Sequence, residues 1–186
     1  MENCWPRENA SPRTALVGFG NPFYGDDAIG PVVARRIYES LPQREHIDLL
    51  ELSTSDFGMM ERLLGYQRAV IVDALVDEQA EVGTVRSIEL SESSSNGHIS
   101  PHTGGFGAAL ALARKLGLGV PAEIALYGVV IREPQSFSDR MSEELEVRLP
   151  EIVRTIATAE RLSENTQAGM PVPCAQKKPG VGETPG

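Results

Sequence analysis

Three short segments of the sequence each contain one side chain that could bind a metal ion: Asp27, Asp73 and His102. The segments read GFGNPFYGDDAIG, AVIVDA and ISPHTGG. Two carboxylates and an imidazole, with no thiolate among them, suit a divalent ion such as nickel, zinc, manganese or iron. Three protein ligands also leave coordination positions open for substrate or water. The segments therefore indicate an open metal site that serves catalysis or recognition.

Each of these residues also has an ordinary structural explanation. Asp27 could cap a helix that begins at Ala28, because aspartate is a preferred capping residue. Asp73 could simply end a buried strand, and His102 could be a histidine in a loop. For any one residue alone, the structural explanation is the simpler one. The metal-site interpretation therefore depends on the three segments taken together.

Two other chemistries fit the sequence less well. Gly18-Phe-Gly20 resembles the start of a dinucleotide-binding fingerprint, but its sixth position is Phe23 instead of glycine. Asp26 and Asp27 would also place negative charge where a pyrophosphate meets the helix N-terminus. The Gly-x-Ser-x-Gly pattern of a serine hydrolase does not occur in the sequence. Dinucleotide binding and serine hydrolysis are therefore both disfavoured.

The elements that must position these residues can be read from hydrophobic periodicity. Short β-branched or alternating runs predict strands, whereas apolar residues at helical spacing predict helices. Strands are expected at residues 14–19, 47–52, 68–75, 83–90 and 123–131, and helices at 28–41, 57–64, 106–116 and 142–162. Pro150 in the last helix predicts a kink or a late start.

This alternation of strands and helices predicts an α/β fold. Each parallel strand pair needs a crossover, which a helix supplies, so we expect a three-layer α/β/α domain with a mostly parallel sheet of about five strands. The strand at 83–90 should lie near an edge. Ligands bind such sheets beyond the carboxyl ends of the strands, where Asp27 and Asp73 are expected to converge.

Length and composition are those of one globular domain. The chain has 186 residues, and we expect a flexible segment at 1–12, one domain at 13–164 and a disordered tail rich in proline and glycine at 165–186. The net charge of −9 disfavours nucleic acid as a partner. Apolar runs are too short to span a membrane and the first residues lack a secretory signal, so we expect a cytoplasmic protein. Cys4 and Cys174 are expected to be free thiols without a role.

Taken in order, the three segments resemble the hydrogenase maturation proteases. The resemblance rests on Gly-x-Gly-Asn followed by Asp-Asp-Ala-Ile-Gly, on Val-Ile-Val-Asp-Ala, and on Ser-Pro-His-x-x-Gly. It extends from about Thr14 to about Leu162 and so covers the whole predicted domain. Members of this family are endopeptidases that remove a short C-terminal extension from the large-subunit precursor of [NiFe] hydrogenases.

The resemblance implies a role for each candidate residue. Asp27, Asp73 and His102 would form the triad that contacts the metal. In the family this metal is nickel already inserted in the precursor, so it would arrive with the substrate, and the protein would bind no other cofactor. The expected partner is therefore the [NiFe]-hydrogenase large-subunit precursor. The oligomeric state stays open, with a monomer as the simplest expectation.

The residues alone leave the chemical mechanism open. The metal could polarise the scissile carbonyl or an attacking water, and Asp26 or Asp73 could act as the general base. Two alternatives to the endopeptidase remain at this point. One is a non-catalytic chaperone that only senses nickel in the precursor, and the other is a metal-dependent amidohydrolase that acts on small substrates.

Overall fold

A computed structural model of the chain describes residues 13–53, 57–90, 106–134 and 136–162. Strands and helices alternate along it in the predicted order. The strands are β1 (Thr14–Phe19), β2 (Ile47–Leu52), β3 (Arg68–Val76), β4 (Val85–Ile88) and β5 (Glu123–Ile131). The helices are η1 (Gly25–Ala28), α1 (Ile29–Ser40), α2 (Phe57–Arg62), α3 (Phe106–Lys115) and α4 (Glu143–Ala159). The expected tails, residues 1–12 and 165–186, lie outside the described residues.

The five strands form one sheet in the order β2-β1-β3-β5-β4. All neighbouring pairs are parallel except β4 with β5, which is antiparallel and places β4 at the edge. The central strand β3 is buried along almost its whole length. Burial on both faces explains why its residues are apolar, apart from Arg68 and Asp73, and often β-branched. The prediction of a mostly parallel sheet with an edge strand near residues 83–90 is confirmed.

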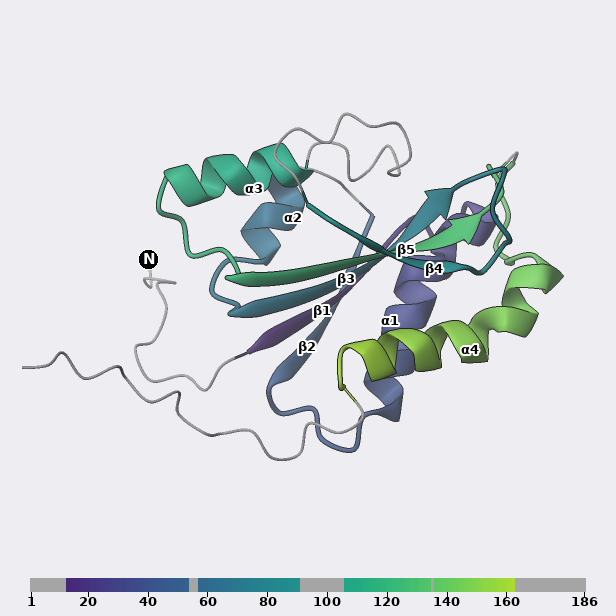
Figure 1. Ribbon diagram of the computed structural model, residues 1–186, viewed down its shortest axis with the longest axis horizontal. Coiled ribbons are helices and arrows are strands. Elements are labelled where there is room, and N and C mark those ends of the chain that lie inside the picture. The colour runs from purple at the N-terminus through teal and green to yellow at the C-terminus, as the bar shows by residue number, and fades with distance from the viewer. Residues whose placement is uncertain (1–12, 54–56, 91–105, 135, 163–186) are drawn as a thin grey trace, which may run out of the picture.

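Helices cover both faces of this sheet, as Figure 1 shows. On one face α1 and α4 pack on a core that includes Leu16, Val70 and Val72. On the other face α2 and α3 pack on a core that includes Ala69 and Ile71. Alternate residues of β3 thus enter opposite cores, as the two-residue period of a strand requires. The expected α/β/α layering is therefore present.

Local structure departs from expectation at the ends of several elements. Strand β4 is shorter than the expected 83–90, and α4 ends at Ala159 instead of 162. A 3₁₀ turn, η1, precedes α1, so the helix begins at Ile29 instead of Ala28. Strand β3 continues to Val76, beyond the expected end. Helix α4 begins at Glu143, next to the expected start at 142, because Ser142 caps it by accepting a hydrogen bond from the Leu145 amide. The helix continues through Pro150, so the late start that this proline suggested is wrong.

None of the helices in the described ranges has both the length and the apolar composition that crossing a membrane requires.

Candidate functional site

Asp27 and Asp73 lie at the point in the sheet where successive connections run in opposite directions. From β1 the chain crosses through α1 to β2 on one side, and from β2 it crosses through α2 to β3 on the other. Asp27 follows β1, and Asp73 comes directly after Val72, the last residue of β3 that pairs with β1. Ligands in open α/β sheets bind in the crevice at such a switch point. The topology therefore supports the predicted convergence of these two acids.

Glycines allow the backbone after β1 to pack tightly against both strands. A Cβ atom at Gly30 would lie 2.1 Å from the carbonyl oxygen of Phe19 and 2.5 Å from that of Val72. A Cβ atom at Gly20, where φ is 146°, would lie 2.0 Å from the carbonyl oxygen of Asp27. No real side chain tolerates contacts this short. These two glycines thus hold η1 and the start of α1 against the ends of β1 and β3.

Asp27 is buried within η1, with 9% of its surface exposed. Its Oδ2 accepts a hydrogen bond from the backbone amide of Asn21 at 2.8 Å. Asn21 Oδ1 in turn accepts from the Phe23 amide at 3.0 Å, and Gly25 takes a left-handed φ of 60°. The cap residue of α1 is Ala28, which makes no side-chain cap bond. The carboxylate thus turns back toward its own loop, and the helix-cap explanation of Asp27 is wrong.

Asp73 is more deeply buried, with 2% of its surface exposed. Its Oδ1 accepts a hydrogen bond from the amide of Ala74 at 2.8 Å. Since β3 continues for three more residues, Asp73 does not end the strand, and that structural explanation is also wrong. By the alternation of β3, Asp73 lies on the same face as Ile71, under α2 and α3.

Asp26, the neighbour of Asp27, contacts the start of α4. Its Oδ1 accepts a hydrogen bond from the Ser142 amide at 2.6 Å, and its Oδ2 accepts from the Ser142 hydroxyl at 2.9 Å. Nearby, the Gly25 amide donates to the Ser138 carbonyl at 2.8 Å. The loop that carries Asp27 is therefore attached to the segment before α4, through residues far apart in sequence.

His102, the third predicted ligand, lies outside the described residues. Within those residues, no three histidine, cysteine, aspartate or glutamate side chains gather closely enough to hold a metal ion. Helix α3 begins at Phe106, four positions after His102, and covers the face on which Asp73 lies. In Figure 1 the start of α3 lies toward the carboxyl ends of the strands. The structure thus brings Asp27 and Asp73 to one region and leaves His102 as a prediction.

A third buried carboxylate, Glu160, was not identified from the sequence. It accepts hydrogen bonds from Arg68 and from the hydroxyl of Tyr127, and together they attach the end of α4 to β3 and β5. Burial, together with the bond to Glu160, raises the pKa of Tyr127 to about 12. Since the three residues are widely separated in sequence, no local pattern could have indicated this cluster. Its charge is compensated internally, which indicates a structural role.

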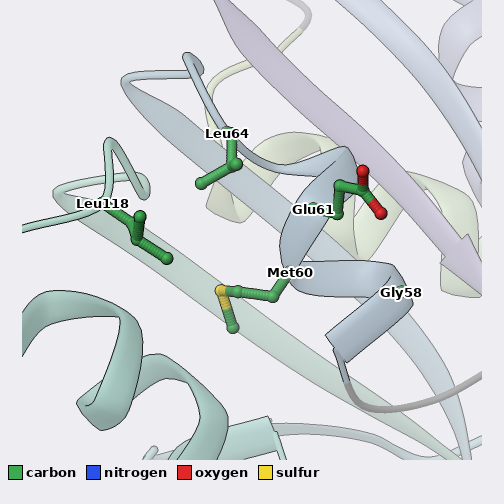
Figure 2. A pocket seen from close by; sticks show the side chains of 5 residues that line it. All are labelled: Gly58, Met60, Glu61, Leu64 and Leu118. Carbon is green, nitrogen blue, oxygen red and sulfur yellow. The ribbon is translucent and has the colours of Figure 1, made fainter. Parts of the chain in front are cut away.

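An apolar pocket of about 290 Å³ lies between α2 and the turn before β5. Figure 2 shows Met60 and Leu64, which lie in and just after α2, and Leu118, which lies in the turn before β5. Glu61 is the one charged residue that lines the pocket. The Gly65 amide donates to the Gly119 carbonyl beside it, at the amino ends of β3 and β5. Neither Asp27 nor Asp73 lines the pocket, so it is separate from the candidate site.

Comparison with known proteins gives a consistent result. The family model for hydrogenase maturation proteases matches residues 31–159. Among solved structures, the hydrogenase-maturating endopeptidase HybD from E. coli is 22% identical, with a TM-score of 0.65 over 82% of this chain and 94% of that one. The [NiFe] hydrogenase maturation protease HybD from Thermococcus kodakarensis is 24% identical, with a TM-score of 0.60 over 82% and 99%. No curated protein sequence gave a significant match.

Proposed function

The chain belongs to the hydrogenase maturation protease family, and from that premise we propose that it removes the C-terminal extension of a [NiFe]-hydrogenase large-subunit precursor after nickel insertion. As a member of this family it is a hydrolase that cleaves peptide bonds. The observation that carries the proposal is the placement of two buried acids, Asp27 and Asp73, at the switch point between β1 and β3. The fold shared with maturation endopeptidases from E. coli and Thermococcus kodakarensis supports it.

In this proposal the precursor brings the nickel, and Asp27, Asp73 and His102 contact it. The donor chemistry fits, because carboxylate and imidazole groups bind borderline divalent ions and three ligands leave positions for groups of the precursor. The hydrogen bonds from the amides of Asn21 and Ala74 would fix the orientation of the two carboxylates. Binding the metal thus tests whether the precursor has received its nickel before the peptide bond is cut.

Bound nickel supplies Lewis-acid polarisation next to the scissile bond. The protein must also supply a group that takes a proton from the attacking water. Both oxygens of Asp26 accept hydrogen bonds from Ser142, which favours a positioning role for this residue. Asp73 is then the better candidate for the general base, because it lies at the switch point itself.

The test uses the purified protein with nickel-loaded and nickel-free forms of a large-subunit precursor. The mass of the precursor is followed over time. We expect loss of the C-terminal extension from the loaded form alone. Equal cleavage of both forms would overturn nickel recognition, and binding without any loss of mass would overturn the proposed reaction.

A further inference from the structure

Two phenylalanines beside the candidate site are largely exposed to solvent. Phe23 is 68% exposed and Phe137 is 79% exposed. Of the large apolar side chains that are exposed in the described ranges, these two are the aromatic ones. An exposed phenylalanine lacks the stabilisation that burial of its ring would give. Two such residues on backbone segments that are hydrogen-bonded to each other therefore point to an intermolecular contact.

The backbones that carry this aromatic pair, Phe23 and Phe137, are held together. The Ser138 amide donates to the Phe23 carbonyl at 3.1 Å, and the Gly25 amide donates to the Ser138 carbonyl at 2.8 Å. The ring of Tyr24 meets the ring of Phe137 edge to face, with centroids 5.1 Å apart. An aromatic surface on a fixed backbone loses little conformational entropy when a partner binds it. The aromatic pair is thus prepared for contact before any partner arrives.

The same loop connects the aromatic pair to the candidate site. Asn21 accepts a hydrogen bond from the Phe23 amide with its side chain and donates one to Asp27 Oδ2 with its own amide. The Asp27 amide donates to the Tyr24 carbonyl at 3.3 Å. A molecule that covers the aromatic pair therefore reaches the immediate surroundings of Asp27.

We propose that the aromatic pair docks the polypeptide segment of the precursor next to the cleaved bond, by covering an apolar side chain of that segment. The inference rests on the proposed function, because it takes the occupant to be the substrate of that site. A peptidase must hold polypeptide on both sides of the bond it cuts, and this apolar surface is continuous with the loop of Asp27. The aromatic pair would thereby contribute to the selection of the precursor segment.

The test compares wild-type protein with Phe23→Ser, Phe137→Ser and the double variant, using nickel-loaded large-subunit precursor as substrate. We expect KM to rise about tenfold in the double variant, which corresponds to about 1.4 kcal/mol of lost binding. The value of kcat should stay within about twofold of wild type, because the aromatic pair does not touch the reacting atoms. Val147→Ser is the matched control, since Val147 is an apolar residue of α4 with 75% exposure.

Each outcome of this experiment decides one statement. Unchanged KM in the double variant, with the wild type active, would overturn the inference and leave the proposed function intact. An equal rise in KM for Val147→Ser would also overturn it, because the effect would not be specific to the aromatic pair. If the double variant lost self-association without a change in KM, the inference would also be overturned, because the occupant would then be a second copy of the chain. A wild type that cannot cleave the precursor would overturn the proposed function and, with it, the inference.

Discussion

Glu160, at the end of α4, and Asp73, in β3, are both buried carboxylates, and the hydrogen bonds that hold them come from different groups. Glu160 accepts from the guanidinium of Arg68 at the start of β3 and from the hydroxyl of Tyr127. Asp73 lies further along the same strand and accepts from a backbone amide, as Asp27 does. Glu160 is thus paired with a guanidinium, whereas Asp73 and Asp27 each accept a hydrogen bond from a backbone amide that fixes the carboxylate.

This difference suggests that one buried carboxylate serves stability and the other serves the reaction. A buried carboxylate paired with a guanidinium is satisfied within the fold, and removing its partner would destabilise the protein. A backbone amide that donates to a carboxylate fixes its orientation, and a ligand for an incoming metal ion needs a fixed orientation. We therefore expect the Glu160 cluster to govern stability and the two aspartates to govern reactivity. Five predictions test this comparison.

The largest effect is expected for Asp73→Asn. The amide has nearly the same shape but cannot act as a base or as an anionic ligand, so processing should fall by about a thousandfold or more. The free energy of unfolding should change by less than about 1 kcal/mol. Precursor mass analysis measures the first quantity and urea unfolding the second. Normal processing would remove Asp73 from the site.

The matched control for that variant is Arg68→Ala, which should lower stability and leave processing unchanged. It leaves Glu160 without its guanidinium, and because Arg68 is itself partly exposed we expect a loss of about 2 kcal/mol in the free energy of unfolding. Processing at a temperature where the variant stays folded should match wild type. A strong loss of activity in a folded Arg68→Ala protein would contradict the division between the two clusters.

Gly30→Ala should damage both stability and reactivity. The added Cβ would lie 2.1 Å from the Phe19 carbonyl oxygen and would push α1 away from β1 and β3. We expect the free energy of unfolding to fall by about 3 kcal/mol, and processing to fall with it because Asp27 moves. Gly117→Ala is the control. Its φ of 68° is also unfavourable for alanine, but nothing lies within 4 Å, so about 1 kcal/mol should be lost and processing should be normal.

A smaller effect is expected for Ser142→Ala, which removes the hydroxyl that both Asp26 and the α4 cap use. The loss of the cap should cost about 1 kcal/mol, and displacement of the Asp27 loop should slow processing about tenfold. Ser142→Thr should restore both properties. Asp26→Asn should slow processing no more than Ser142→Ala does, because the side-chain oxygen of asparagine can still accept a hydrogen bond from the backbone amide of Ser142. A far larger loss in Asp26→Asn would identify Asp26 as the general base.

The smallest effect is expected for Tyr127→Phe, whose difference in stability from wild type should depend on pH. In the folded protein the pKa of Tyr127 is raised to about 12, whereas in the unfolded chain it should lie near its ordinary value of 10. The protonated Tyr127 hydroxyl therefore stabilises the folded protein fully below pH 10, and this contribution is lost as pH rises toward 12. Urea unfolding at pH 8 and pH 11 should show a stability gap between wild type and variant that narrows at the higher pH. A constant gap would mean that the hydroxyl contributes no pH-dependent stability.

Local patterns in the sequence were sufficient for the order of the elements, but long-range contacts were not predictable from them. Hydrophobic periodicity identified the strands and helices. It also led to the mostly parallel sheet in which Asp27 follows β1 and Asp73 lies in the neighbouring β3, whereas the role of these acids stays a prediction. Neither the contact of Asp26 with Ser142 nor that of Arg68 with Glu160 has a sequence signature, since each joins residues far apart in the chain. Pro150 was misleading, because the cap at Ser142 fixes where the helix starts.

The pairing of β1 with β3 also has a consequence for how the protein is made. Asp27 and Asp73 come together only when β3 lies beside β1, and this contact spans a long stretch of chain that includes α1, β2 and α2. A nascent chain that has not yet released β3 from the ribosome therefore carries one acid without the other. Since the proposed reaction needs both acids, molecules that are partly made or partly folded should be inactive. The activity of a preparation should therefore be proportional to the number of its fully folded molecules.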